Sequence, residues 1–327
     1  MPPKRIIIDT DPGVDDALTF LLALASPEIQ LEALTITQGN VTVERGARNA
    51  LATLEFLNAG HIPVAQGTSL PLIACPGSAM RAGGPLLASG VVHGVSGLGD
   101  TNLPEPRTKP LPRHAIDYLI ERFLAEPGEL SLFAIGPLTN AALAIRKEPR
   151  FAGAVKEMVI MGGAIREGGN ITPQAEFNVY ADPHAAHIVF HSGIPITLIP
   201  LDVTHKCLLM WEQIQALGKV DTPISRFIME ATAPYVKFTH GKTGIEGCAL
   251  HDPLTLATII APELLTLEEH FVDVDISSGP SHGNTFADFY HTTGKPANMK
   301  VALDVRGEEF VELFLRRMKD LEKMISS

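Results

Sequence analysis

The stretch RIIIDTDPGVDDA, residues 5–17, decides the fold of this chain. An apolar run of strand type ends at Asp9, the first of four carboxylates that fall within eight positions around a Pro-Gly turn. Like charges held so closely repel one another, so a folded chain keeps them together when a cation compensates their charge. Carboxylate oxygens are ligands of hard divalent cations, and the stretch therefore predicts a metal-centred site after the first strand.

A structural explanation of the acidic turn covers only part of it. Asp15 would cap the helix that follows, and Asp16 would favour the positive end of the helix dipole. Neither role accounts for Asp11, which the Pro-Gly turn brings back towards those two residues. The clustering therefore favours a functional site over helix capping.

Short apolar runs alternate with helix-like segments along the chain, which is typical of βαβ units and a mainly parallel sheet. The predicted fold is α/β, with an open, mostly parallel, Rossmann-like sheet flanked by helices, in one domain over residues 1–327. Ligands bind such sheets at the carboxyl ends of the strands, where the acidic turn lies. The predicted strands are Arg5–Asp9, Leu31–Thr37, Leu130–Ile135, Glu157–Met161 and Ile196–Pro200. The predicted helices are Asp15–Ser26, Val43–Ala59, Arg113–Glu126, Thr139–Lys147 and Pro183–His191.

The remaining segments carry weaker patterns. Gly60–Pro112 and Gly162–Asn178 are irregular, Leu208–Gly241 has a helical pattern, and Phe271–Val305 has strand-like runs. No linker separates these segments, so we expect a helical insertion in the carboxyl-terminal third of a single domain.

Composition narrows the class of protein. The chain has 327 residues, 45% of them hydrophobic, and a net charge of −11, which argues against a nucleic-acid or anionic-membrane partner. The three cysteines form no CxxC pair, so they indicate neither a disulfide framework nor a zinc site. A signal peptide and a membrane-spanning stretch are not predicted, and we expect a cytoplasmic enzyme.

The acidic turn also invites a different interpretation. An apolar strand that ends in Asp-x-Asp resembles haloacid-dehalogenase-type phosphatases, in which one Asp is a nucleophile and magnesium binds the phosphate. Those proteins continue with Thr or Val after a spacer, whereas this chain continues with Pro12–Gly13 and adds Asp15 and Asp16. A metal-dependent phosphohydrolase is therefore the alternative enzyme class, and a nucleoside- or ribose-binding protein is the non-catalytic alternative.

Beyond the turn, the chain resembles the nucleoside hydrolase family of the inosine–uridine-preferring type. The resemblance rests on six short motifs in family order, which are jointly specific. They are Asp9–Asp16, Thr37–Asn40, Val92–Gly94 with Gly97–Gly99, Ile135–Asn140, Met161–Gly163 with Asn170 and Glu176–Asn178, and Leu250–Pro253. The family cleaves the N-glycosidic bond of ribonucleosides to give ribose and a free base, using a bound Ca²⁺ ion.

The resemblance implies a role for each matching residue. Side chains of Asp11, Asp16 and Asp252 and the backbone carbonyl of Ile135 would bind calcium, although the family often has Thr at the last position. Asp11 would also be the general base that activates water. The ribose hydroxyls would be bound by residues that offer amide or carboxylate groups; these are Asp15, Asn40, Asn170, Glu176 and Asn178.

Two histidines match family positions near the base. His251 matches the residue that protonates the leaving base, and it adjoins Asp252. The alternative role for His251 is to orient a metal ligand by a hydrogen bond to its carboxylate. His93 matches a second histidine near the base, although a lone histidine is more often structural. Asn40 and Asn170 follow glycines and are equally consistent with turns.

The sequence leaves several points open. Glu176 and Asn178 would point the same way if their segment were extended. A loop with His240, Lys242 and Glu246 would form a lid or a solvated surface, and Trp211 would line the base pocket or cover the core. We expect inosine–uridine or pyrimidine preference, a role in nucleoside salvage or catabolism, and a homodimer or homotetramer.

Overall fold

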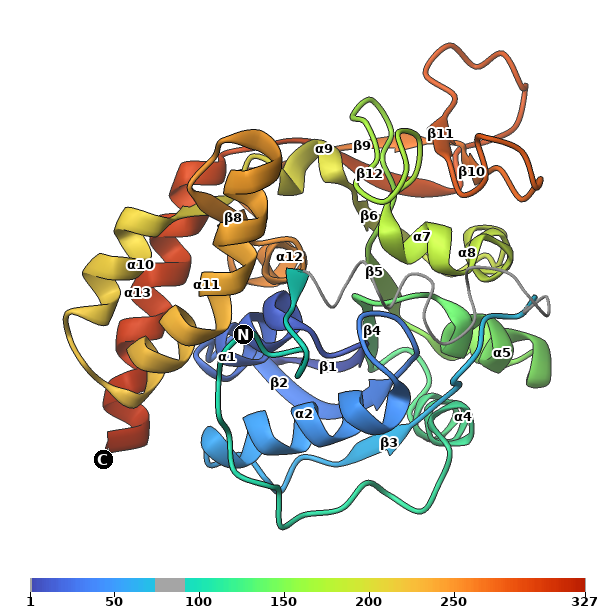
Figure 1. The fold of residues 1–327 in the computed structure, drawn as a ribbon. Helices are drawn as coiled ribbons and strands as arrows, with labels where there is room; N and C mark the ends of the chain where they lie inside the picture. The colour runs from blue at the N-terminus through green and yellow to red at the C-terminus, as the bar shows by residue number, and fades with distance from the viewer. Residues whose placement is uncertain (1, 74–91, 327) are drawn as a thin grey trace.

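A computed structural model describes residues 2–73 and 92–326. Its main feature is an eight-stranded sheet with helices on both faces (Figure 1). In spatial order the strands are β3 (Val64–Gln66), β2 (Ile29–Ile36), β1 (Lys4–Thr10), β4 (Ser131–Ala134), β5 (Glu157–Met161), β6 (Ile196–Ile199), β12 (Met299–Val305) and β9 (Leu265–His270). All neighbouring strands are parallel except β12 and β9. The predicted open, mostly parallel sheet is confirmed.

Helices cover the sheet from both sides, and two further strand pairs stand outside it. The helices are α1 (Val14–Leu24), α2 (Val43–Phe56), α4 (Ala115–Ala125), α5 (Thr139–Lys147), α6 (Phe151–Ala154), α7 (Phe177–Ala181), α8 (Pro183–Phe190), α9 (Leu201–Thr204), α10 (Trp211–Gly218), α11 (Pro223–Thr243), α12 (Ala257–Ile260) and α13 (Gly307–Ser326). The outer pairs are β7 (Leu208–Met210) with β8 (Gly247–Ala249), and β10 (Val272–Val274) with β11 (Thr285–Ala287).

Strand alternation divides the core into two layers. Successive side chains of a strand point to opposite faces of the sheet. Accordingly Ile6 and Ile8 of β1 pack with residues of α1, α2, α11 and α13, whereas Ile7 packs with residues of α4, α5 and α8. The apolar run before the acidic turn is thus buried on both faces, as a central parallel strand requires.

Several boundaries differ from the predicted ones. Helix α1 begins at Val14 with Gly13 as its N-cap, so Asp15 does not cap it. The helical insertion is present as α10 and α11, but Leu208–Met210 is a strand rather than helix. Helix α11 continues to Thr243 and ends at Gly244, where φ is 76°, so the predicted loop around residue 240 is the last helical turn.

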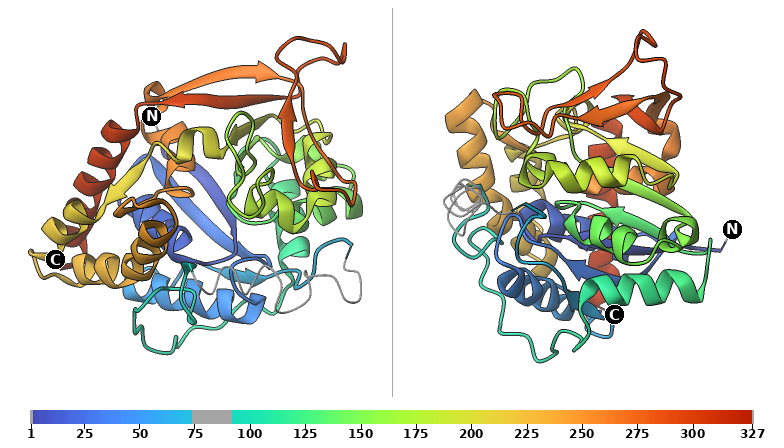
Figure 2. Two further views of the ribbon diagram at one scale, coloured as in Figure 1. Left: turned by 45° about the horizontal axis from the view of Figure 1, so that its top comes forward. Right: turned by 90° about the vertical axis from the view of Figure 1, so that its right-hand side faces the viewer.

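The order of strands positions the acidic turn. β1 lies between β2 and β4, which is the point where the strand order of a Rossmann-like sheet reverses. Loops after β1 and β4 diverge there and leave a crevice at the carboxyl edge. The left-hand view of Figure 2 shows the side of the sheet farthest from β3, where the orange strand β9 runs antiparallel to the red strand β12. Among the described helices, none is long and apolar enough to cross a membrane.

Candidate active site

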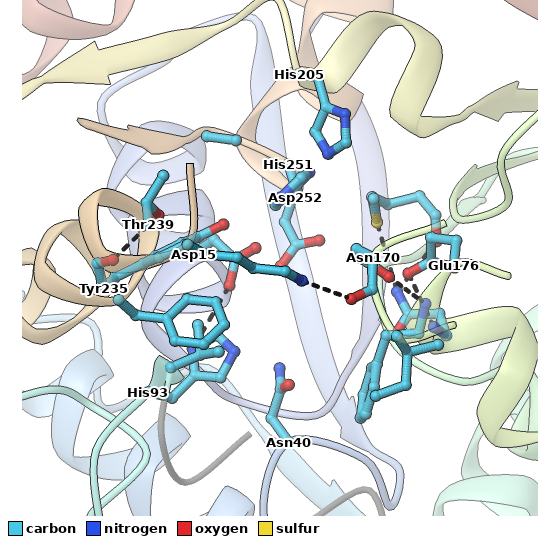
Figure 3. A pocket seen from close by; sticks show the side chains of 18 of the residues that line it. Asp15, Asn40, His93, Asn170, Glu176, His205, Tyr235, Thr239, His251 and Asp252 are labelled. Carbon is cyan, nitrogen blue, oxygen red and sulfur yellow. Dashed lines mark hydrogen bonds and ion pairs between the residues drawn. The ribbon is translucent and has the colours of Figure 1, made fainter. Parts of the chain in front are cut away.

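A cavity of about 650 Å³ opens at the carboxyl edge of β1 and β4, between α11 and the loop before α7 (Figure 3). It brings together residues that are far apart in the sequence. Every predicted site residue lines it except Asp11 and Asp16, which lie directly behind its wall. The lining members are Asp15, Asn40, His93, Ile135, Asn170, Glu176, Asn178, His251 and Asp252.

Two carboxylates on the floor of this cavity, Asp15 and Asp252, converge with Asp16 behind it. One oxygen each from Asp15, Asp16 and Asp252 lies within 4.8 Å of the others, and all three residues are buried. Burial, followed by repulsion from Asp15, raises the pKa of Asp252 well above its usual range. In the part of the chain that the structure describes, no lysine or arginine forms an ion pair with the three carboxylates.

Asp11 is held behind the cluster by two glycines. Its Oδ2 accepts a hydrogen bond of 2.6 Å from the Asn40 backbone N–H. A Cβ atom at Gly39 would lie 1.9 Å from Oδ2, and one at Gly136 would lie 2.6 Å from Oδ1. The buried Oδ1 atom has no hydrogen-bond partner among residues 2–73 and 92–326. Burial, followed by repulsion from Asp16, raises the pKa of this carboxyl well above its usual range.

Asp16 and Asp9, two further carboxylates of the turn, accept hydrogen bonds from the protein, but Oδ2 of Asp9 has no partner among the described residues. Asp16 accepts hydrogen bonds from the Thr10 hydroxyl, from the Gly13 backbone N–H at 2.8 Å and from the Asn40 side-chain amide at 3.3 Å. Asp9 lies outside the cavity lining, where one oxygen accepts from Thr35 and Asn140. Burial raises the pKa of Asp9 to about 7. Asp9 therefore connects β1 to β2 and to the first turn of α5.

The donor set fits a hard cation. Two buried oxygen atoms at the cluster, Oδ1 of Asp11 and Oδ1 of Asp15, have no hydrogen-bond partner within the described structure. The Ile135 carbonyl follows β4 and accepts one hydrogen bond, from the Asn178 amide at 2.9 Å, so one lone pair is left. Oxygen donors of this kind match the ligand preference of Ca²⁺.

Glu176 and Asn178 hold the opposite wall of the cavity. Glu176 caps α7 by accepting from the backbone N–H groups of Asn178 and Val179, and it also accepts from Gly163 N–H at 2.9 Å. The Asn178 amide donates to the carbonyl of Ile135, directly after β4, and to that of Met161, the last residue of β5. The segment is not extended, because α7 begins at Phe177. Both side chains line the cavity because the helix begins at its wall.

His93 is fixed by the amino terminus of α1. Its Nδ1 accepts a hydrogen bond of 3.1 Å from the Val14 backbone N–H, so the ring carries its proton on Nε2. Burial lowers the pKa of His93 to about 4 and keeps the ring neutral. Oδ1 of Asp15 lies 4.0 Å from Nδ1. A Cβ at Gly13 would lie 2.8 Å from the same nitrogen, which explains the glycine of the turn.

The loop that carries His93 is anchored to α11. Pro234 has no N–H to donate to the carbonyl of Glu230, four residues earlier, and that carbonyl instead accepts the backbone N–H of Asp100 at 3.1 Å. Gly99 has a φ of 63°, and a Cβ there would lie 2.2 Å from the Ala231 carbonyl oxygen. The proline in α11 and the glycine in the loop thus allow close contact between the two segments.

His251 lies across the cavity from His93. Its Nδ1 makes a hydrogen bond of 2.7 Å with the Thr204 hydroxyl, and the ring of His205 contacts it edge-on at a centroid distance of 5.6 Å. Burial lowers the pKa of His251 to about 3, although part of the residue is exposed. Thr204 therefore fixes the orientation of this imidazole.

Sequence reasoning missed part of the cavity wall. His205 and, from α11, Tyr235, Phe238 and Thr239 line it. The α11 residues recur at spacings of three and four, a helical signal that was available but gives no indication of which side faces a pocket.

The proposed lid residues divide into two groups. Lys242 lines the cavity, and its ammonium donates to the Asn170 carbonyl at 3.3 Å, which joins α11 to the loop before α7. His240 and Glu246 are exposed and outside the lining. Trp211 packs against the core and does not line the cavity.

The fold and the site define an α/β enzyme whose active site lies at the carboxyl edge of a parallel sheet and contains buried acids. Comparison with known proteins gives the particular family. Residues 6–312 match the family model described as inosine-uridine preferring nucleoside hydrolase, and the chain belongs to that family. It is therefore an N-glycosidase of the ribonucleoside hydrolase class.

Individual relatives agree with this assignment. The pyrimidine-specific ribonucleoside hydrolase RihA of Klebsiella pneumoniae is 39% identical over 96% of this chain and 97% of its own length. Among solved structures, the purine-preferring ribonucleoside hydrolase from Gardnerella vaginalis has a TM-score of 0.90 at 34% identity, covering 98% of this chain and 100% of that one. The plant nucleoside hydrolase PpNRh1 has a TM-score of 0.88 at 35% identity, covering 97% and 99%.

Proposed function

We propose that this ribonucleoside hydrolase depends on Ca²⁺ and acts preferentially on pyrimidine ribonucleosides. One observation carries the calcium proposal: buried carboxylates converge at the cavity floor without a lysine or arginine partner in the described structure. Uncompensated buried charge of this kind is strongly unfavourable, and a divalent cation removes the penalty. The proposed ligands are Asp11, Asp16, Asp252 and the carbonyl of Ile135.

The chain's own groups then divide the work at the sugar. A bound calcium ion would supply positive charge that orients the ribose diol and acidifies the attacking water. Asp11 accepts the proton of that water, because its Oδ1 is the unused acceptor beside the cluster. Asp15 likewise has a buried oxygen without a partner, which accepts a ribose hydroxyl.

The remaining wall residues complete the sugar site. Asn40, Asn170, Glu176 and Asn178 line the cavity, and hydrogen bonds hold each of them in position. Such fixed donors and acceptors stabilise the oxocarbenium-like transition state as charge develops on the ribose. Because the fold already holds these side chains in position, they need to move little during the reaction.

The two histidines act on the base. His251 donates a hydrogen bond or proton from the nitrogen opposite Thr204, which favours departure of the base. His93 carries its proton on Nε2 and is a donor to a carbonyl oxygen of the base. A matched pair of donors suits uracil and hypoxanthine, which both present exocyclic oxygen.

Two findings support pyrimidine preference. The relative RihA is named as pyrimidine-specific. In the described part of the cavity, no tryptophan lines the wall, so the side chain with the largest surface for stacking on a purine is absent there. The aromatic lining residues are Phe177, Tyr235 and Phe238. Incubation with uridine, cytidine, inosine and adenosine, followed by measurement of released reducing sugar, tests the proposal. The largest kcat/KM should be found for uridine or cytidine; a larger value for adenosine would contradict it.

The proposed role in the cell is nucleoside salvage or catabolism, by a cytoplasmic homodimer or homotetramer. Release of free base and ribose supports such a role, because both products are reusable. Light scattering on the purified protein would test the assembly, and a monomer would contradict that part of the proposal.

A further inference from the structure

A second cluster of ligand-type side chains lies outside the active site. His187 and His191 are four residues apart at the carboxyl-terminal end of α8, so they share one face of the helix. Asp273 of β10 faces them. In Figure 1, α8 and β10 lie on the right, whereas α11, which lines the cavity, lies on the left.

The three side chains converge on a single point. Asp273 Oδ1 lies 2.9 Å from Nδ1 of His187 and 3.2 Å from Nε2 of His191. The ligand atoms of all three residues lie within 4.8 Å of one another. Tetrahedral zinc with bonds of about 2.0–2.2 Å places neighbouring ligand atoms about 3.3 Å apart. The observed spacing therefore needs little adjustment to hold an ion.

Hydrogen bonding alone accounts poorly for this convergence. The same Oδ1 atom also accepts the Val274 backbone N–H at 2.9 Å. Three nitrogen atoms thus face one carboxylate oxygen, which has two lone pairs in the plane. A cation placed among the three ligand atoms would use the ring lone pairs and leave Oδ1 with fewer donors.

The surroundings suit a bound cation. The negative end of the α8 dipole lies at His187 and His191. The Asp273 side chain is 14% exposed, while the imidazoles are 41% and 34% exposed, so an ion has an entry path. The aromatic ring of Phe271 packs against His191 at 6.0 Å, and Lys295 lies over that ring at 4.5 Å. The ammonium group of Lys295 is a nearby positive charge, and it would repel a bound cation.

We infer that His187, His191 and Asp273 form a site for a borderline divalent metal ion, with Zn²⁺ as the best fit. Two imidazole nitrogens and one carboxylate oxygen match zinc, and water would complete a tetrahedral shell. The oxygen-only cluster in the cavity differs in chemistry and favours a hard ion. A bound ion would join α8 to the β10–β11 pair.

Zinc titration of the calcium-saturated protein tests the inference. The full chain is stripped with a chelator, reloaded with excess Ca²⁺, and titrated with Zn²⁺ by calorimetry. The expected result is one zinc equivalent per chain, and Co²⁺ in place of Zn²⁺ should give visible d–d absorption. His191→Gln and Asp273→Asn should each weaken binding by at least about tenfold.

His184→Gln provides the matched control, because His184 is on the same helix but outside the cluster. It should bind zinc like the wild-type chain. Thermal melting verifies that each variant is folded, and Zn²⁺ should raise the melting temperature of the wild-type chain but not of His191→Gln. Absence of binding by the wild-type protein, or equal binding by all variants, would overturn the inference.

Discussion

The substitution Gly39→Ala tests whether the position of Asp11 is essential for catalysis. The added methyl carbon would lie 1.9 Å from Oδ2 of Asp11 and 2.6 Å from its Cγ. Ordinary contact begins near 3.4 Å, so the carboxylate or the loop must move by about 1.5 Å. Because the side chain of Asp11 is short and held by the Asn40 N–H, the displacement reaches the proposed base directly.

The expected cost follows from that displacement. A misplacement of about 1 Å at a reacting group lowers the rate by about a hundredfold. We therefore expect kcat/KM for uridine to fall by at least about a hundredfold in Gly39→Ala, or about 2.7 kcal/mol of transition-state stabilisation. Overpacking should lower the free energy of unfolding by only about 1–3 kcal/mol, and the variant should remain folded.

The assay measures released reducing sugar together with thermal unfolding. Gly153→Ala is the matched control, because no described atom outside its own stretch of α6 lies within 4 Å of the added carbon. That variant should keep wild-type activity. Gly136→Ala approaches the other oxygen of Asp11, at 2.6 Å, so its effect should not add to that of Gly39→Ala. Wild-type kcat/KM in folded Gly39→Ala would refute the reasoning.

Three further predictions follow from the site. His251→Ala should slow inosine hydrolysis more than hydrolysis of p-nitrophenyl riboside, whose leaving group needs no proton; equal losses would exclude an acid role. Thr204→Val should also slow inosine hydrolysis more than hydrolysis of p-nitrophenyl riboside, but by a smaller factor. The substitution removes the hydrogen bond that orients the imidazole and leaves the imidazole in place. Burial raises the pKa of Asp9 to about 7 and of Asp15 to about 8. The stability these groups contribute is present below about pH 4 and lost as pH rises to about 8. The melting temperature of the calcium-free protein should therefore fall over that range, and calcium should restore it most at high pH; a melting temperature that rises with pH would contradict this.

The sheet was predictable because its strands carry strong patterns. β1, β2, β4, β5 and β6 are apolar runs buried on both faces, and each predicted strand is present. β9 was missed because it is an edge strand whose middle residues, Thr266–Glu269, are exposed, so its sequence shows little apolar alternation. β7 and β8 are three residues each, too short to show a period.

The acidic turn was predictable for local reasons, and the rest of the site was not. Asp11, Asp15 and Asp16 stand together in the sequence, whereas Asp252 joins them only through the fold. Asp252 was predicted as a site residue from the resemblance to a family, and not from its spacing to the other acids. His205 and the residues of α11 depend on how the insertion packs over the crevice, which no local pattern specifies.

Calcium titration of the chelated enzyme tests the central claim most directly. The proposal predicts that protein stripped of metal hydrolyses uridine at no measurable rate, and that activity rises with added Ca²⁺ until one equivalent per chain is bound. Calorimetry on the same sample should give the same stoichiometry, and Asp252→Asn should lose both binding and activity. Full hydrolysis by the metal-free enzyme would contradict the account.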